Sequence, residues 1–317
     1  MGELAPFQRV SVVIPAYNAE AVIENTLASV RAQTLPAYEI IVVDDGSRDR
    51  TADVVRSHDG VTLIQQANAG VSAARNCAIR AASGTWVALL DADDDWLPDK
   101  NLRQLALLEA HDEIVWSACN AHYVLASGER RAAMPPDIAL RLRQGIVPYF
   151  ESVVAGVPYV TSGLVIRRDI LDRVGAFDLG LHGPEDRDLF WRVAASFPQI
   201  AYVGDISCAY HLDTPNSITK GSRERSQSLR MVCSNIRRDK AGGQVDPAML
   251  RYGRDLALFN YLARFAAGEI MLSNEAAAEA RALIEPTVGE RLLLAGLQIL
   301  PDPVSRRLVR LVQPKFH

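Results

Sequence analysis

Basic residues are not in excess in this sequence. Its 317 residues include 34 Lys and Arg against 38 Asp and Glu, which gives a formal net charge of −4. Proteins that hold a nucleic-acid backbone concentrate Lys and Arg on one face. We therefore expect no nucleic-acid partner.

Cysteine is scarce and scattered. None of the four cysteines forms a CxxC pair, and long stretches of chain separate them. Zinc sites and disulfide frameworks use closely or regularly spaced cysteines, so neither is expected. The pattern is typical of reduced thiols in a cytosol. The cysteines are Cys77, Cys119, Cys208 and Cys233.

Long apolar runs are also missing. No stretch approaches the roughly 20 apolar residues that cross a bilayer, and residues 1–9 lack the basic start and apolar run of a signal peptide. We expect a cytoplasmic protein. With 49% hydrophobic and 23% charged residues, the chain suits one large globular domain plus an appendage.

Short apolar, β-branched runs alternate with helical patterns in the first half of the chain. This βαβα rhythm predicts an α/β fold with a Rossmann-like, mostly parallel sheet flanked by helices. Because the runs are almost continuously apolar, we expect strands covered on both faces. The strand candidates are Val10–Ile14, Ile40–Val43, Val61–Ile64 and Trp86–Leu90, and the helix candidates are Ala19–Gln33 and Gly70–Ala82.

The second half of the chain is less regular. Strands are expected at Ile114–Ala118, Leu164–Arg167 and Ile200–Val203, and a helix at Glu185–Ala195. From about residue 221 the pattern is helical, so we expect a main domain over 1–220 and a helical C-terminal region over 221–317.

Polar side chains follow three of the predicted strands. Ligands of parallel sheets bind beyond the carboxyl ends of the strands, so these groups are expected to share one rim. The segments are Pro15-Ala16-Tyr17-Asn18, Asp44-Asp45-Gly46-Ser47 and Asp91-Ala92-Asp93-Asp94-Asp95.

The acidic segment after the fourth strand holds four carboxylates in five positions. Such neighbours repel one another unless a cation compensates, and oxygen ligands suit Mg²⁺ or Mn²⁺ with positions left for phosphate. The alternative is a helix N-cap with solvated neighbours before a helix at about Asp99–Glu109. In either case we expect Asp94 or Asp95 to serve a local turn or cap.

With these residues in view, the sequence resembles the family 2 glycosyltransferases of GT-A fold over residues 9–212. Five motifs occur in the family order. They are SVVIPAYN at Ser11–Asn18, IVVDDGSRDRT at Ile41–Thr51, NAGVSAARN at Asn68–Asn76, ALLDADDDWLPDK at Ala88–Lys100 and PEDRDLFWRV at Pro184–Val193. The resemblance implies an inverting enzyme that uses a nucleoside diphosphate sugar, with a nucleotide-binding half over about 9–112 and an acceptor half over about 113–220.

The resemblance also implies roles for the rim. Asp91-Ala92-Asp93 is the DxD element, in which Asp93 ligates the metal and Asp91 faces the ribose or the metal's water shell. Asp45 meets the nucleobase edge, with Pro15 and Tyr17 lining the base pocket. Asn18 belongs to the same nucleotide-binding set. Asp44 is instead expected to cap its turn with Ser47.

Arg75 is the expected cation for the diphosphate. It lies in the helix that follows Asn68 and Gly70, whose N-terminal dipole also favours an anion. The alternative is a solvated helix arginine.

An inverting transfer needs a base for the acceptor hydroxyl. The resemblance implies Asp186, with Glu185 as a stabilising neighbour or a hydrogen-bond partner of the acceptor. The alternative for this acidic pair is electrostatic support of the helix N-terminus. His211 is either a metal or diphosphate ligand, as in some relatives, or a structural histidine. Trp96 and Trp191 are either sugar-stacking or core residues.

The expected acceptor is a glycan, a lipid-linked sugar or a protein. Residues Leu292–Leu311 carry Arg306, Arg307 and Arg310, so this segment either lies on the inner face of the membrane or packs on the main domain. Two other functions compete. A nucleotidyltransferase requires a glycine-rich loop after the first strand, which is absent. A non-catalytic subunit would have lost the acids that this chain keeps.

Overall fold

The computed structural model describes residues 5–142, 144–212, 231–232, 234–239, 241–243 and 246–253. The chain forms two compact units. The first comprises Met1–Gly180 and Arg192–Ser217, and the second comprises Leu181–Trp191 and Ile218–His317.

One ten-stranded sheet organises the first unit. Its strands are β1 (Val10–Ala16), β2 (Glu39–Asp44), β3 (Val61–Gln65), β4 (Trp86–Leu89), β5 (Asp95–Trp96), β6 (Trp116–Val124), β7 (Arg130–Ala132), β8 (Gln144–Pro148), β9 (Val165–Arg167) and β10 (Gln199–His211). The order is β3-β2-β1-β4-β9-β6-β10-β5, with β7 on β6 and β8 on β10. The strands β3, β2, β1 and β4 are parallel to their neighbours within this group, whereas β9 is antiparallel to both β4 and β6.

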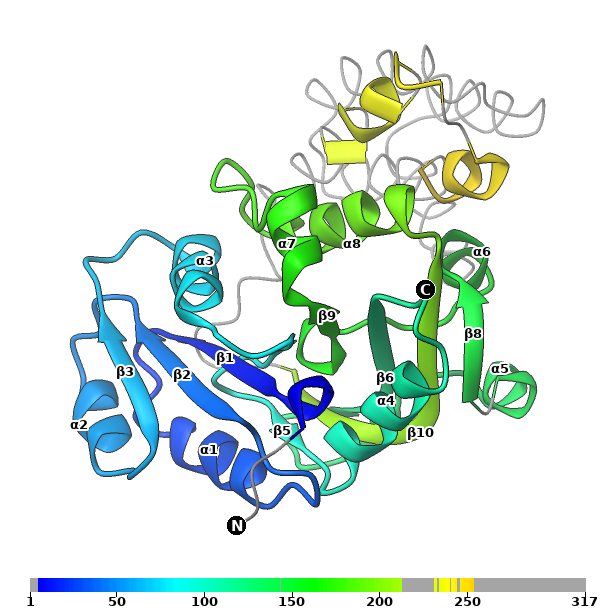
Figure 1. Ribbon diagram of the computed structural model, residues 1–317. Coiled ribbons are helices and arrows are strands. Elements are labelled where there is room, and N and C mark those ends of the chain that lie inside the picture. Colours follow the sequence, from blue (N-terminus) through cyan, green and yellow to red (C-terminus); the bar gives the residue numbers. More distant parts are fainter. Residues whose placement is uncertain are drawn as a thin grey trace, which may run out of the picture. The chain divides into compact units, whose positions relative to one another are not determined.

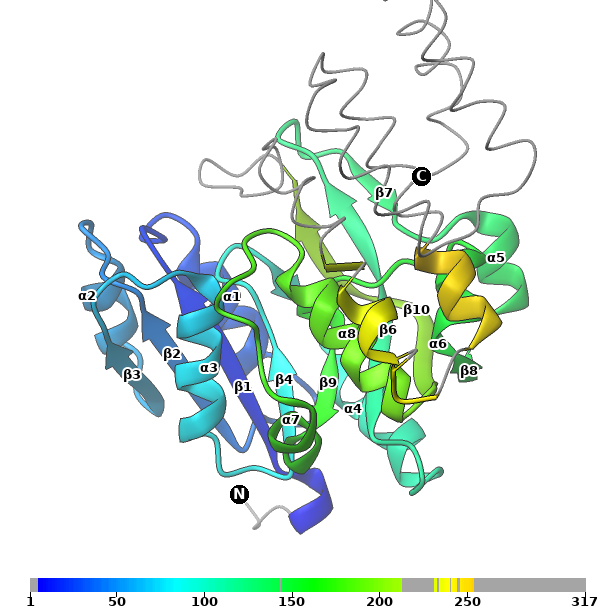
Figure 2. The ribbon, with the colours of Figure 1, turned by 90° about the horizontal axis from the view of Figure 1, so that it is seen from above.

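Helices cover both faces of the parallel part of the sheet. Figures 1 and 2 show α3 on one face and α1 and α2 on the other. The described helices are α1 (Ile23–Arg31), α2 (Thr51–Arg56), α3 (Val71–Ala81), α4 (Lys100–Glu109), α5 (Pro136–Arg141), α6 (Tyr149–Val154), α7 (Arg168–Val174) and α8 (Glu185–Ser196), with the 3-10 turns η1 (Pro6–Gln8) and η2 (Thr161–Gly163). The predicted α/β fold class is confirmed.

Among the described residues up to His211, each strand and helix expected from the sequence is present, and one expectation about burial is wrong. Every residue of β1 is buried, as expected for a central strand. The expectation that β3 would be covered on both faces was wrong, because β3 is an edge strand with Thr62 and Gln65 exposed. An apolar run does not distinguish an edge strand from a central one.

Strand β10 is much longer than the four residues expected. It pairs with β8 through its first half and with β5 through Cys208 and Ala209, and its register against β6 shifts between Val203 and Cys208. These irregularities bend the strand. The first half of β10 therefore has β8 as its neighbour, whereas the second half has β5.

A carboxylate holds the amino ends of the strands together, at the edge opposite the polar rim. Glu39 Oε1 accepts hydrogen bonds from the hydroxyl of Ser11 at 2.5 Å and from the N–H of Ser83 at 2.6 Å. Gly84 donates its N–H to Ser11 Oγ at 2.8 Å. A Cβ at Gly84 would lie 2.6 Å from Ser11 Oγ, so only glycine fits there.

In the second unit, residues 231–232, 234–239, 241 and 247–253 are helical. Most of the remainder of the region 221–317, which was expected to be helical, lies outside the described residues, as does the basic segment Leu292–Leu311. Within the described part of the chain, no helix has the length and apolarity that a membrane crossing requires.

Candidate active site

The three polar segments predicted to share a rim do lie together. They follow β1, β2 and β4, which are consecutive neighbours in the sheet. The N–H of Asp45 donates to the carbonyl of Ala16 at 2.8 Å, which joins the first two segments directly. The rim follows from strand order, since parallel strands point their carboxyl ends the same way.

Asn18 is joined to the turn after β2 by two hydrogen bonds. Its backbone lies in the left-handed region with φ +49°, its N–H donates to Ser47 Oγ at 2.9 Å, and its Oδ1 accepts the N–H of Arg48 at 2.9 Å. Asp44 accepts the N–H of Ser47 at 3.0 Å. The prediction that Asp44 caps this turn is therefore confirmed.

Asp45 organises the approach to α3. Its carboxylate is buried and accepts the N–H groups of Ala69 at 2.9 Å and Gly70 at 2.8 Å, and the amide of Gln66 at 2.7 Å. Gly46 has φ +75°, and a Cβ there would lie 2.8 Å from the backbone nitrogen of Asn68. The turn after β2 and the loop before α3 thus form one packed unit at the rim.

The two side chains expected to line the base pocket differ in exposure. Pro15 is buried within β1, whereas Tyr17 is 41% exposed. Asn68, in the loop before α3, is also exposed. Tyr17 and Asn68 are therefore accessible to a ligand at the rim.

Arg75 of α3 is buried and paired. Its Nη2 lies 2.6 Å from Asp91 Oδ1, and its guanidinium carbon lies 5.0 Å from the centre of the Phe177 ring. The side chain of Arg75 is only 6% exposed. The alternative of a solvated helix arginine was wrong, because α3 turns this residue toward the acidic segment.

The acidic segment, which we call the acidic loop (Asp91–Asp95), does not cap a helix. It leads into β5, and α4 begins later, with Asp99 at its N-cap and no side-chain hydrogen bond there. The helix-cap alternative for Asp91 and Asp93 was therefore wrong. The two side chains are partly exposed, so both are accessible at the rim.

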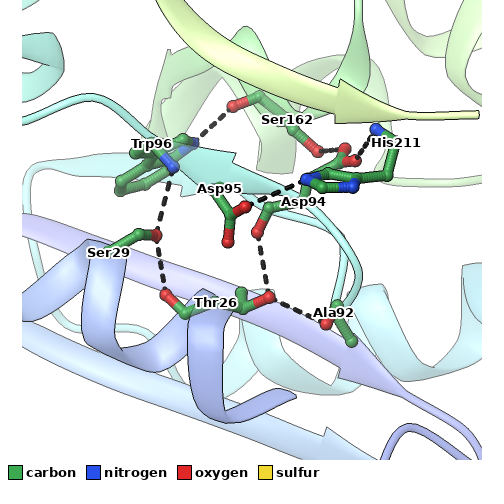
Figure 3. Close-up of polar contacts among 8 residues, drawn as sticks. All are labelled: Thr26, Ser29, Ala92, Asp94, Asp95, Trp96, Ser162 and His211. Carbon is green, nitrogen blue, oxygen red and sulfur yellow. Dashed lines mark hydrogen bonds and ion pairs between the residues drawn. The ribbon is translucent and has the colours of Figure 1, made fainter. Parts of the chain in front are cut away.

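Asp94 is the member of the acidic loop that serves local structure, as expected. Its N–H donates to the carbonyl of Asp91 at 3.1 Å, and its fully buried carboxylate accepts the hydroxyl of Ser162 and the N–H of His211 (Figure 3). Burial, followed by the charges of Asp91 and Asp93, raises the pKa of Asp94 well above its usual range. Asp94 thus joins the loop to the end of β10.

A second set of contacts comes from α1. The hydroxyl of Thr26 lies 2.8 Å from the carbonyl oxygen of Ala92 and 2.9 Å from that of Asp94. Ser29 Oγ accepts the N–H of Trp96 at 3.1 Å (Figure 3). Trp96 itself is buried and donates its indole N–H to the carbonyl of Ser162, so it is a core residue.

The donor chemistry of the acidic loop fits a divalent metal that keeps ligands from a diphosphate. Among the described residues, no three His, Cys, Asp or Glu side chains are gathered for metal binding. Asp91 contacts Arg75, and His211 Nε2 lies 3.0 Å from Asp95 Oδ2. Mg²⁺ and related ions bind through one or two carboxylates plus phosphate oxygens, and the partly exposed Asp93 meets that requirement.

The acidic pair of α8 belongs to the second unit. Glu185 is buried and accepts the N–H of Gly183 at 2.7 Å, so it shapes the loop before the helix. Asp186 is partly exposed and accepts the N–H of Arg187 at 2.6 Å. Trp191 is buried and donates to Asp239 at 2.8 Å, which confirms it as a core residue.

Comparisons with known proteins identify the family. A family model described as "Glycosyl transferase family 2" matches residues 11–174. The uncharacterised glycosyltransferase YibD of Escherichia coli strain K12 is 32% identical over 241 residues, covering 70% of this chain and 66% of YibD. The putative teichuronic acid biosynthesis glycosyltransferase TuaG of Bacillus subtilis is 40% identical over 104 residues, covering 31% of this chain and 41% of TuaG. The chain thus spans less than two thirds of the length of both relatives.

Solved structures share the fold. The crystal structure of Staphylococcus aureus TarS 1–349 with UDP-GlcNAc has a TM-score of 0.75 at 18% identity and covers 97% of this chain and 92% of its own. The mannosyltransferase PcManGT of Pyrobaculum calidifontis, in complex with GDP-Man and Mn²⁺, has a TM-score of 0.59 at 21% identity, covering 95% of this chain and 84% of its own. At these identities the likeness establishes the architecture of the chain.

Proposed function

The chain belongs to the family 2 glycosyltransferases and has the GT-A fold, and from this premise we propose that it transfers a sugar, with inversion, from a nucleoside diphosphate to a carbohydrate-containing acceptor. The observation that carries the proposal is the shared rim of β1, β2 and β4, where the acidic loop lies beside the turns that follow the other two strands. The structural relatives that were solved with UDP-GlcNAc and GDP-Man support a nucleotide sugar as donor.

The nucleotide is assigned to the turns after β1 and β2 and to the start of α3. Tyr17 offers a half-exposed ring for the base, with Pro15 and Asn18 supporting the same turn. Asp45 fixes the N–H groups of Ala69 and Gly70 at the approach to α3. Uridine is the base we favour, because the structural relative TarS was solved with UDP-GlcNAc.

The diphosphate is assigned to Asp93, Asp91 and Arg75, with His211 at the end of β10. When bound, Mn²⁺ or Mg²⁺ would supply Lewis-acid stabilisation of the departing diphosphate, and Asp93 would hold it. Arg75 supplies positive charge beside Asp91, within 2.6 Å of its carboxylate. PcManGT, solved with Mn²⁺, supports a divalent cofactor.

The reaction we propose is a single displacement. The acceptor oxygen attacks the anomeric carbon from the face opposite the diphosphate, and the bond from that carbon to the diphosphate oxygen breaks with its electron pair leaving on the diphosphate. The proton of the acceptor hydroxyl passes to the carboxylate of Asp186. Glu185 accepts the N–H of Gly183 at 2.7 Å and so shapes the loop that precedes Asp186.

Calorimetry with UDP and GDP, with and without Mn²⁺, tests the nucleotide assignment. Metal-dependent binding that is lost in Asp93→Ala is expected, because removing a carboxylate ligand leaves the cation without its protein contact. Turnover of a UDP-sugar with inversion at the anomeric carbon, read by NMR, tests the chemistry. Tight nucleotide binding without turnover on any sugar would favour a non-catalytic subunit instead.

A further inference from the structure

The acidic loop is held by two hydroxyl groups that come from distant parts of the sequence. Ser162 lies in η2, and Thr26 lies on α1. Both side chains are fully buried, with 0% of their surface exposed. Figure 3 shows them on opposite sides of the loop.

Ser162 spans the loop from its first to its fourth residue. Its Oγ accepts the N–H of Asp91 at 3.1 Å and donates to the carboxylate of Asp94. Its carbonyl accepts the indole N–H of Trp96 at 2.7 Å. One residue therefore sets the separation between the two ends of the segment that carries Asp93.

Thr26 holds the peptide group that precedes Asp93 and the one that follows Asp94. Its Oγ1 lies 2.8 Å from the carbonyl oxygen of Ala92 and 2.9 Å from that of Asp94. A hydroxyl has a single proton, which these two carbonyls share. The backbone on both sides of Asp93 is thus fixed, while the Asp93 side chain stays partly exposed.

We propose that Ser162 and Thr26 are positioning residues that hold the backbone of Asp93 in the shape needed to bind the metal and diphosphate of the donor. The inference rests on the proposed function. Residues that orient a metal ligand commonly change metal affinity by about 10- to 100-fold when removed, and a preformed ligand avoids the ordering cost of binding. Through Asp94, Ser162 also links the loop to the N–H of His211 at the end of β10.

The two roles open to Thr26, packing and hydrogen bonding, are separated by a pair of substitutions. Thr26→Val keeps the shape of the side chain and removes the hydroxyl, whereas Thr26→Ser keeps the hydroxyl and removes a methyl group. Positioning predicts that Thr26→Val weakens Mn²⁺-dependent UDP binding about 10-fold and that Thr26→Ser binds like wild type. The opposite order would overturn the inference in favour of packing.

Ser162→Ala is compared with Ser152→Ala, a matched loss of a buried hydroxyl that bonds the carbonyl of Tyr149 and the hydroxyl of Tyr159 away from the rim. Calorimetry measures the Kd for UDP with and without Mn²⁺, and thermal unfolding measures stability. We expect Ser162→Ala to lose about 10-fold in the Mn²⁺-dependent affinity only, and Ser152→Ala to lose none. If wild type and Ser162→Ala bind UDP with equal Mn²⁺-dependent affinity, this inference is overturned while the proposed function stands. Absence of Mn²⁺-dependent UDP and GDP binding in wild type overturns the proposed function with it.

Discussion

Arg75 and Asp91 form a nearly buried ion pair, 2.6 Å between Nη2 and Oδ1, which links α3 to the acidic loop. Removing one partner of such a pair leaves a charge with little solvent, and this typically costs more than the pair contributes. The pair therefore affects the stability of the rim as well as its charge.

Asp91→Asn should lower the free energy of unfolding by about 3 kcal/mol, because the buried guanidinium loses the negative charge of Asp91 at 2.6 Å. The double variant Arg75→Met with Asp91→Asn should recover part of that loss, since it also removes the buried guanidinium charge. Denaturant unfolding of the set measures the coupling. The exposed pair Arg131 and Glu129 is the control, and Glu129→Gln should leave the free energy of unfolding nearly unchanged. A double variant less stable than either single would contradict this account.

Asp186→Asn should keep donor binding and lose turnover by about 10²- to 10⁴-fold, because an amide cannot accept the proton of the acceptor hydroxyl. Calorimetry with UDP and steady-state kinetics separate the two effects. Asp172→Asn, which makes the same change on an exposed residue of α7, is the control and should leave UDP binding and turnover unchanged. Near-normal turnover in Asp186→Asn would place the base at another residue.

The buried amine of Lys100 should make the free energy of unfolding depend on pH in the alkaline range. Its ammonium is fully buried, 3.9 Å from the centre of the Trp96 ring, with no hydrogen-bond acceptor among the described residues. Burial lowers the pKa of Lys100 to about 8, although Cys119 and Cys208 act in the opposite direction. Between about pH 8 and 10.5 the unfolded chain binds a proton that the folded chain does not, so stability rises with pH across this window.

Between pH 8 and 10.5 the free energy of unfolding of wild type should therefore rise by up to about 3 kcal/mol relative to that of Lys100→Met. At pH 7 the methionine variant should be at least as stable as wild type, because a buried charge is replaced by an apolar chain of similar length. Urea unfolding at steps of pH measures both. Parallel pH profiles for the two proteins would show that this amine is not the group responsible.

Glu39 should contribute stability at neutral pH that is lost in acid. Burial raises its pKa, but donors from Ser11, Ser83 and Gly84 outweigh that effect, and the net pKa is lowered. A lowered folded pKa adds stability above the unfolded pKa, and this stability is lost as pH falls through the folded value. Glu39→Gln should lower the free energy of unfolding by about 1 to 2 kcal/mol at pH 7. It should also weaken the fall in that free energy as the pH drops below about 4.5. Glu109→Gln, on an exposed residue of α4, is the control for chemical denaturation.

Much of the fold and the rim could be predicted from the sequence because both depend on local patterns. Apolar β-branched runs specify strands whatever their partners, and the residue after a strand is at the rim if the sheet is parallel. Asp44, Asp45 and Asp91 were located in this way. The family motifs then supplied roles that geometry alone does not assign.

The supports of the acidic loop could not be predicted, because they depend on contacts between distant segments. Ser162 and Asp91 are 71 positions apart, and Thr26 and Ala92 are 66 apart. Thr26 did carry a signal, since a hydroxyl residue lies on the buried stripe of α1 between Ile23, Leu27 and Val30. Ser162 carried none, and the burial of Lys100 was equally hidden, because a lysine two residues after a proline reads as a surface residue.

The two-residue strand β5 fixes how many residues the acidic loop can contain. The chain leaves the sheet after Leu89 of β4, and five intervening residues bring it to Asp95 of β5, which pairs with β10 at the other end of the strand order. Six Cα steps from Leu89 to Asp95 would reach about 20 Å if fully extended, close to four strand spacings in a flat sheet, which are about 19 Å. The segment is not extended, because Asp94 donates its N–H to the carbonyl of Asp91 at 3.1 Å and so closes a turn within it. The sheet must therefore curl until its last strand comes back beside its middle. An inserted residue would slip Trp96 out of register with Cys208 and turn its indole from the interior to solvent.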